Sequence, residues 1–512
     1  MKFFACLLLL AAAIAPGMAA LTRGPYLQDS TPGSIVIRWR TSTAESSRVI
    51  YGTNPATCDL TNNIDAGVTE HIVTLTNLSA DTKYFYSIGA SNTTLAGPGA
   101  NHFFLTHPLS GTPKPLRVWI IGDAGTKDAS QVAVRNAFET FNGTNTLHAW
   151  LQLGDNAYDS GYDSEYQSAV FNIYTNELRN SVTWPTLGNH ETVQSTAYVD
   201  TYPYFSIFTL PTAGEAGGVA SGTEHYYSFD LGMVHFICLD SMTADRATNG
   251  AMATWLRSDL AVTTSRWLIA FWHHPPYSKG SHDSDPGGSG YDVQMGEMRA
   301  NFLPILENGG VDLVFSGHSH AYERSKLLNG HYGISTTFNA ATNVVQTGSG
   351  RETNGVGAYH KPDGLGEHPV GNRGTIYTVA GSSGKVSGGT VNHPAMFYSA
   401  LTLGSVVLDF NTNRLDAIFL RETGATNDSF TIIKDGTCPP RLTDLTPLTN
   451  GDFQFTVLTR GYRTNIIEAS TCLAVTGAWQ PVGTNTTTNA FFSFTHTNAL
   501  TNASQFYRVR RP

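Results

Sequence analysis

The sequence predicts a layered α/β domain in the middle of the chain, with a smaller all-β domain on each side. In the middle part, apolar runs end in polar residues, as in LRVWIIGD, AWLQLGD, MVHFICLD, RWLIAFWHH and VDLVFSGH. Helical stretches lie among them at 129–141 and 295–308. Such alternation with nearly continuous apolar strands indicates a sheet covered on both faces. The two flanking parts alternate short strands with turns and have almost no helical periodicity, which is typical of small β-sandwiches.

Length and charge limit the classes of protein that fit. A chain of 512 residues is too long for one core, so we expect two or three domains. Charged residues make up 14% and aromatic residues 11%, which suits an ordered, β-rich protein. The net charge of −9 argues against a nucleic-acid-binding surface. It also disfavours a polyanionic substrate unless a local cationic centre attracts it, and two metal ions would be such a centre.

Residues 1–20 have the pattern of a cleaved secretory signal peptide. Lys2 gives the positive end, 3–14 the apolar run, and 17–20 the small residues of a cleavage site. The run is too short for a membrane anchor, which needs about 20 apolar residues. No later segment is apolar enough to span a membrane. We therefore expect a secreted or periplasmic protein.

Four cysteines remain after the signal peptide, and their spacing suits neither a metal site nor a disulfide scaffold. Cys238 lies in an apolar strand and is expected to be a buried free thiol. Cys438 and Cys472 could pair. Cys58 stands alone in the first domain.

Domain boundaries follow from changes in pattern. Residues 21–108 predict a β-sandwich with Trp39 in its core, and the linker PLSGTPKPL follows. The α/β domain is expected at 115–437. Within it, the Gly-rich stretch 329–371 reads as a flap near an active site, because long loops are usually functional or disordered. Residues 441–512 predict a small β-module that could contact a surface or polymer.

A set of oxygen and imidazole side chains, most of them just after apolar runs, carries the functional signal. It appears in GDAG, GDNAY, GNHE, WHHP and GHSH, and its members are Asp123, Asp155, Tyr158, Asn189, His273, His318 and His320. Ligands bind beyond the carboxyl ends of strands in such sheets. Imidazole suits first-row transition metals, carboxylate suits harder ions, and phenolate points to ferric iron. Two metals about 3.5–4 Å apart can neutralise phosphate oxygens and activate water for hydrolysis of a phosphate ester.

Each motif alone has an ordinary structural explanation. Asp123 and Asp155 could each begin a helix as N-cap residues. Asn189 could lie in a turn, the histidine pair at 273–274 in a core, and GHSH in an exposed loop. All five motifs in this order are hard to explain by chance.

These five motifs resemble the signature blocks of the calcineurin-like metallophosphoesterases, and Tyr158, three residues after Asp155, narrows the resemblance to the purple acid phosphatases. The resemblance covers about 21–436, including RGPYLQ at the start and AYERS after GHSH. It implies a metallophosphoesterase β-sandwich with flanking helices, of α/β (α+β) class. It also implies a fibronectin type III-like N-terminal domain, whose corner tyrosine matches Tyr84. The module at 441–512 lies outside the resemblance.

The resemblance also implies a role for each ligand. Asp123, Tyr158 and His320 would bind Fe(III), and Asp155 would bridge the two metals. The remaining three would bind a divalent Fe, Zn or Mn ion: Asn189, His273 and His318. Either histidine of WHHP could be the ligand, but the family's register favours His273, which leaves His274 a supporting role.

Two further histidines are candidates for catalysis. His190 would point at the bound phosphate and either stabilise charge in the transition state or assist protonation. His282, nine residues after His273, would protonate the leaving group, or it is an exposed loop residue. Asp240 also ends an apolar run but matches no block, so we expect a structural role.

The expected function is that of an acid phosphatase acting on small phosphate monoesters, with attack of a metal-bound hydroxide on phosphorus and an acidic optimum. One alternative is a phosphodiesterase or nucleotide phosphatase on the same metal core. Another is a surface-binding protein that has lost activity, although no ligand position is missing.

Overall fold

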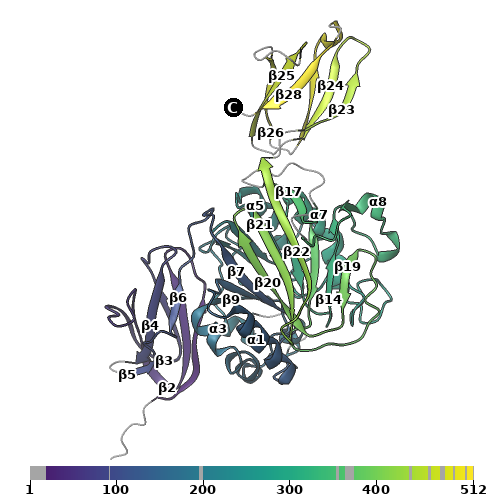
Figure 1. Ribbon diagram of the computed structural model, residues 1–512. Helices are drawn as coiled ribbons and strands as arrows, with labels where there is room; N and C mark the ends of the chain where they lie inside the picture. Colours follow the sequence, from purple (N-terminus) through teal and green to yellow (C-terminus); the bar gives the residue numbers. More distant parts are fainter. Residues whose placement is uncertain are drawn as a thin grey trace, which may run out of the picture.

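The structure is a computed structural model with three β-rich parts (Figure 1). It describes residues 19–90, 93–194, 200–352, 357–363, 374–437, 441–458, 463–472, 479–487, 491–501 and 504–510. The predicted signal peptide, except for its last two residues, and Cys438 lie outside the described residues, so both the signal and the Cys438–Cys472 pair stay predictions. Within the described part of the chain, no helix combines the length and the hydropathy that a bilayer crossing requires.

The N-terminal part is an all-β sandwich, as predicted. Its strands are β1 (Leu21–Gln28), β2 (Ile35–Gly52), β3 (Leu60–Leu75), β4 (Lys83–Ala90), β5 (Thr93–Ala96) and β6 (Phe103–Leu105). Trp39 is fully buried and stacks on the His71 ring at 4.7 Å. The Tyr84 hydroxyl accepts a hydrogen bond from the Ser79 amide at 3.0 Å, which is the expected tyrosine corner. β2 is one long strand with irregular pairing to β3 between Arg40 and Ser47.

The first central sheet begins with parallel strands and continues into the N-terminal sandwich. β7 (Leu116–Ile121), β8 (Ala149–Gln152) and β9 (Val182–Pro185) are parallel neighbours. On one side, β20 (Gly404–Asn411), β21 (Arg414–Arg421), β22 (Thr426–Thr437) and β17 (Tyr359–Asp363) extend the sheet. On the other side, β1 pairs in parallel with β9, so the sheet runs through both domains.

The second central sheet has seven strands in the order β10-β11-β12-β13-β18-β14-β19. These are β10 (Tyr227–Leu231), β11 (Val234–Cys238), β12 (Trp267–Phe271), β13 (Leu313–Ser316), β14 (Tyr322–Ser325), β18 (Ile376–Ala380) and β19 (Met396–Ala400). β11, β12, β13 and β18 are parallel. The predicted apolar runs are therefore all strands, and Cys238 is a buried free thiol on β11.

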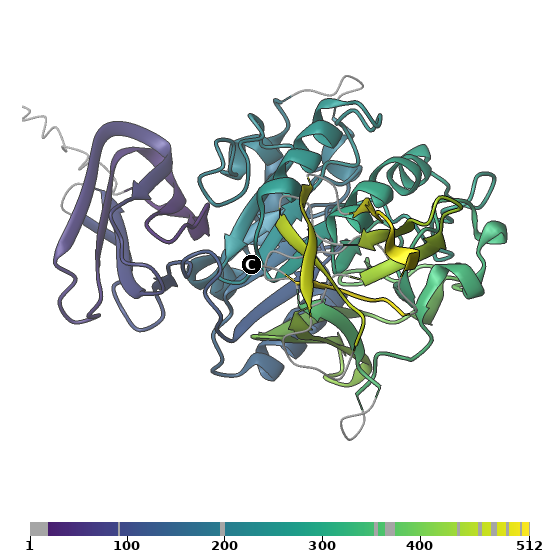
Figure 2. The same cartoon turned by 90° about the horizontal axis from the view of Figure 1, so that it is seen from above.

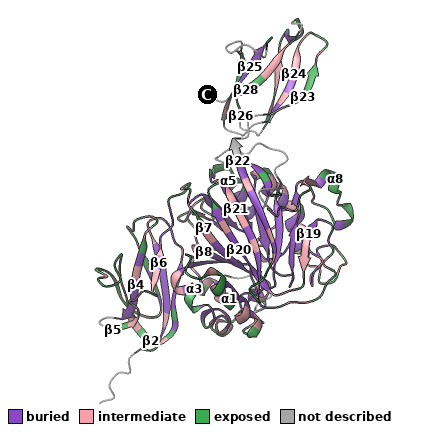
Figure 3. Ribbon diagram, viewed as in Figure 1, coloured by how far each residue is buried: buried purple, intermediate pink, exposed green. Residues whose placement is uncertain are grey.

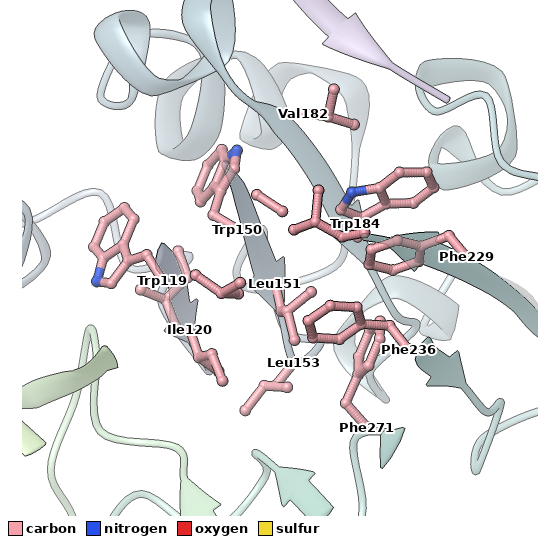
Figure 4. Packing of buried hydrophobic residues seen from close by; sticks show 14 of the residues in the cluster. Trp119, Ile120, Trp150, Leu151, Leu153, Val182, Trp184, Phe229, Phe236 and Phe271 are labelled. Atoms are coloured by element: carbon pink, nitrogen blue, oxygen red, sulfur yellow. The ribbon is translucent and has the colours of Figure 1, made fainter. Parts of the chain in front are cut away.

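The core lies between the two sheets, and helices cover their outer faces. The helices are α1 (Ala129–Asn142), α2 (Asp163–Tyr166), α3 (Thr175–Asn180), α4 (Pro203–Ile207), α5 (Ala251–Val262), α6 (Val293–Glu297), α7 (Leu303–Gly309) and α8 (Ala340–Asn343). Two π-helical segments are η1 (Gln167–Phe171) and η3 (Met298–Phe302), and η2 (His190–Thr192) and η4 (Ser335–Thr337) are short 3-10 helices in the described residues. Trp184 of the first sheet stacks on Phe229 of the second at 3.9 Å (Figure 4). Trp119 stacks on Phe138 of α1 at 4.1 Å. The central strands are buried along most of their length (Figure 3), so each sheet is covered on both faces, as predicted.

In its described residues, the stretch 329–371 consists of turns, two short helical segments and two short strands, and the flap stays a prediction. β15 (Leu327–Leu328) pairs with β16 (Val344–Gln346), and β17 pairs with β22. The loop after β18 contacts the ligand loops, and the Ser387 amide donates to the His320 carbonyl at 3.2 Å.

The C-terminal part is a small pair of three-stranded sheets beyond the end of β22 (Figure 1). They are formed by β23 (Arg441–Pro447), β24 (Phe453–Leu458), β25 (Arg463–Ser470), β26 (Gln480–Thr487), β27 (Phe491–His496) and β28 (Phe506–Arg510), with the turn η5 (Ala499–Thr501). Phe455, Val457 and Ile467 form its small core. Figure 2 shows the N-terminal sandwich on one side of the central layers.

A buried charged cluster away from the ligand loops ties the second sheet to α5. His235 of β11 lies between two carboxylates, with Nδ1 2.7 Å from Asp230 Oδ1 and Nε2 2.8 Å from Asp259 Oδ2. Because both partners are acceptors, both ring nitrogens carry protons and the imidazole is charged. Burial alone would lower the pKa of His235, but the two carboxylates outweigh burial and raise it to about 10.

We predict that this cluster makes stability fall at alkaline pH. The folded-state pKa of His235 lies above its ordinary value of 6.5, so the contribution is complete below pH 6.5 and is lost as the pH rises through about 10. Denaturant unfolding across this range measures it. The difference in unfolding free energy between the wild type and His235→Gln should shrink as the pH rises. A difference that does not change with pH would contradict the assignment.

Candidate metal centre

The predicted ligands meet where the parallel strands of the two sheets end. Asp123 follows β7, Asp155 follows β8 and Asn189 follows β9. His273 follows β12, and the GHSH residues follow β13 in the second sheet. All seven side chains lie close together, and all but Asn189 are buried. The structure therefore brings together every ligand that the sequence predicted.

The Asp155 carboxylate lies between two groups of ligand atoms. Its Oδ2 atom is 3.2 Å from the Tyr158 hydroxyl. Its Oδ1 atom is 3.5 Å from His273 Nε2 and accepts a hydrogen bond from the His190 amide at 3.0 Å. Each oxygen thus faces a different group.

The first group surrounds the Tyr158 hydroxyl. This oxygen lies 3.2 Å from Asp123 Oδ1, 3.2 Å from Asp155 Oδ2 and 3.2 Å from His320 Nε2. His320 Nε2 is also 3.6 Å from Asp123 Oδ1. Three oxygens and one imidazole nitrogen therefore converge on one position.

The second group surrounds the Asn189 side-chain oxygen. Its Oδ1 atom lies 3.0 Å from His273 Nε2 and 3.0 Å from His318 Nδ1. The two imidazole nitrogens are 3.2 Å apart. Together with Asp155 Oδ1, the second group therefore offers two oxygens and two nitrogens.

The outer hydrogen bonds of these histidines show that the converging nitrogens carry no proton when the rings are neutral. His273 donates from Nδ1 to the Leu153 carbonyl at 2.8 Å, because a carbonyl only accepts. His318 donates from Nε2 to Asp292 Oδ2 at 2.8 Å. The inner nitrogens and the Asn189 oxygen therefore present lone pairs to one another, which is unfavourable unless a cation lies among them. This donor set fits a transition-metal ion.

Burial keeps these histidines neutral. It lowers the pKa of His273 to about 3, of His318 to about 4 and of His320 to about 3. Burial, with the nearby Asp155 charge, raises the pKa of Asp123 well above its ordinary value. Burial and the Asp155 and Asp123 carboxylates also raise the pKa of Tyr158. A cation between these groups would offset the repulsion and favour the ionised carboxylates and phenolate.

The backbone at the ligands is unusual and requires glycine beside it. Asp123, Asp155 and His318 have φ of 55°, 51° and 66°, in the left-handed region that few residues other than glycine adopt. A Cβ atom on Gly188 would lie 2.2 Å from Asp155 Oδ1, and one on Gly317 would lie 2.4 Å from Asp123 Oδ2. The glycines of GNHE and GHSH therefore let the loops approach one another.

Three residues that the sequence analysis did not assign support the ligand loops. Glu191 is fully buried and accepts from the amides of Asp155 at 2.9 Å, Asn156 at 2.6 Å and Gly188 at 2.7 Å. Ser387 Oγ lies 2.7 Å from His320 Nδ1, and Asp292 accepts from His318. Glu191 lies two residues after the predicted ligand Asn189, and this proximity could have identified it from the sequence. Asp292 and Ser387 have no motif around them.

The candidate catalytic histidines lie at the rim of the centre. His190 donates from Nδ1 to the Asp159 carbonyl at 2.6 Å, and its Nε2 is 3.9 Å from Asp155 Oδ2. The His282 ring lies 3.8 Å from the His318 ring, and Nδ1 is 2.8 Å from the Gly290 carbonyl. The side chains are 32% and 28% exposed, so both can reach a ligand in solution.

The neighbouring residues that were expected to be structural do not join the two groups. His274 Nδ1 contacts the Ser241 hydroxyl at 2.9 Å, although its ring packs 4.5 Å from that of His318. Asp240 accepts from the amides of Met242 and Thr243 and contacts His225.

Comparison with known proteins agrees with this geometry. Residues 116–322 match the calcineurin-like phosphoesterase family, and residues 25–104 match the purple acid phosphatase N-terminal domain. Purple acid phosphatase 18 of Arabidopsis thaliana is 29% identical over 263 residues, which are 51% of this chain and 54% of that protein. The purple acid phosphatase of Glycine max is 27% identical over 370 residues, 69% of each chain.

Solved structures show the same fold. A purple acid phosphatase from yellow lupin seeds (Lupinus luteus) superposes with a TM-score of 0.59 at 19% identity, over 81% of this chain and 76% of that one. The structure of PhoD gives a TM-score of 0.56 at 13% identity, over 83% and 92% of the two chains.

Residues 116–322 therefore form a calcineurin-like phosphoesterase domain. Within that class, the N-terminal domain and the curated relatives make the chain similar to purple acid phosphatases. The predicted family is confirmed. The chain spans only about half of the first of these curated relatives (54%).

Proposed function

We propose that this protein is a secreted or periplasmic acid phosphatase that hydrolyses small phosphate monoesters at a pair of metal ions. The observation that carries the proposal is the convergence of oxygen and imidazole side-chain atoms in two groups, one on each oxygen of Asp155. A division into a signal peptide (1–20), an N-terminal domain (21–108), a catalytic domain (115–437) and a C-terminal module (441–512) belongs to the same proposal.

The first group would hold Fe(III), because it contains the phenol of Tyr158 with Asp123 and His320. The second group would hold a divalent Fe, Zn or Mn ion, with Asn189, His273 and His318 as ligands and Asp155 shared. When bound, the pair of ions would supply a hydroxide nucleophile at acidic pH and neutralise phosphoryl oxygens.

The protein's own residues orient the substrate and move protons. His190 keeps its Nδ1 proton on the Asp159 carbonyl, which directs its Nε2 side toward the Asp155 carboxylate and the phosphate position. It would stabilise charge on a phosphoryl oxygen. His282 lies over the ring of His318 and is fixed through Gly290, so it is placed to give a proton to the leaving oxygen.

Steady-state rates on p-nitrophenyl phosphate and bis(p-nitrophenyl) phosphate test the proposed activity. We expect the monoester to be turned over faster, with dependence on added metal. His318→Ala should lower the rate by roughly 10²–10³-fold, the scale for losing one electrostatic stabiliser. A faster diester rate would favour a phosphodiesterase, and no metal-dependent turnover of either would favour an inactive binding protein.

The role of His282 can be tested by comparing hydrolysis rates of substrates with different leaving groups. His282→Ala should slow hydrolysis of an alkyl phosphate by about 10²–10⁴-fold, the usual contribution of general acid catalysis. It should slow p-nitrophenyl phosphate much less, because nitrophenolate leaves without protonation. The exposed His360 on β17 gives a control, His360→Ala, that should leave both rates unchanged. Equal slowing of both substrates by His282→Ala would contradict the assigned role.

A further inference from the structure

Asp292 occupies a helix N-cap but does not use its side chain as a cap. It precedes α6 with an extended backbone (φ −115°, ψ 136°), and its carboxylate makes no hydrogen bond to that helix. Aspartate at this position normally accepts from the first turn, an interaction worth about 1 kcal/mol. The side chain gives up this local stabilisation and points elsewhere.

The carboxylate is directed at two histidines of the candidate centre. Asp292 Oδ2 accepts from His318 Nε2 at 2.8 Å and lies 3.4 Å from His282 Nδ1. The two rings are 3.8 Å apart. One carboxylate oxygen therefore contacts both a ligand of the second group and the candidate proton donor.

The contact decides which nitrogen of His318 faces inward. With its Nε2 proton held by Asp292, His318 presents the Nδ1 lone pair to Asn189 and His273. The corresponding outer partners of the other two histidine ligands are the Leu153 carbonyl and the Ser387 hydroxyl, which carry no charge. Among the described residues, His318 is therefore the one of these three histidines whose outer nitrogen contacts a carboxylate, which fixes its tautomer and makes its inner nitrogen a stronger ligand.

We propose that Asp292 is a positioning residue that builds the divalent half of the centre and holds His282 beside it. The inference rests on the proposed function, because it assumes that the second group binds the divalent ion. Asp292 has no such role at the ferric half, because among the described residues its carboxylate makes no contact there. Loss of Asp292 should therefore weaken binding of the divalent ion and leave iron binding unchanged.

The test uses full-length protein that retains its iron and has been depleted of the divalent ion by dialysis. Zn²⁺ is titrated into wild type, Asp292→Ala and Asp292→Asn in competition with a coloured chelator, while iron content and visible absorbance are recorded. Asp292→Ala should bind Zn²⁺ about 10–100-fold more weakly, the usual cost of losing an outer partner of a metal ligand. Iron content and absorbance should stay as in the wild type.

The asparagine variant and a surface control separate positioning from general damage. Asp292→Asn should lose less affinity than the alanine variant, because the amide oxygen still accepts from His318 Nε2. Asp245 is an exposed aspartate that accepts from the Ala247 amide, so Asp245→Ala should bind Zn²⁺ as the wild type does.

Two results would overturn the inference. One is wild-type Zn²⁺ affinity in Asp292→Ala. The other is equal loss of iron and Zn²⁺, which would mean that Asp292 supports the whole centre rather than one half. A wild-type protein that takes up no metal would contradict the proposed function itself, so the two failures can be told apart.

Discussion

The arrangement depends on one buried carboxylate, Asp155, that faces two groups of electron-rich atoms. A second carboxylate, Asp123, and a phenol lie on one side, and two imidazole nitrogens with an amide oxygen lie on the other. Burying so many lone pairs without a positive charge is costly, because unpaired charge in a protein interior loses hydration that nothing replaces. A metal ion in each group would resolve this conflict. The loops around the centre would then hold the ligands of these ions in place.

The fold supplies this scaffold through its two sheets. The carboxyl ends of β7, β8 and β9 meet those of β12 and β13, so loops far apart in the sequence reach one place. Left-handed backbone at three ligands costs on the order of 1–3 kcal/mol each. Hydrogen bonds between the loops offset part of this cost. The His318 amide donates to Asp123 Oδ2 at 2.7 Å, and Glu191 accepts from three loop amides.

The sequence predicted the strands and the ligands because both leave local signals. Apolar runs that end in Asp or His report a buried strand and its carboxyl end together, and the α1 segment has clear helical periodicity. Asp292 and Ser387 could not be found, because their partners lie 26 and 67 residues away and depend on how the loops close. Glycine-rich composition at 329–371 did not reveal the long-range pairing of β17 with β22.

The visible absorption spectrum of the purified protein in air tests the central claim most directly. We expect a broad charge-transfer band that gives a violet colour, because the Tyr158 phenolate would bind Fe(III). The band should disappear in Tyr158→Phe. A colourless wild-type protein with both metals bound, or an unchanged band in Tyr158→Phe, would contradict the account and leave only a two-metal phosphoesterase without the iron–tyrosinate pair.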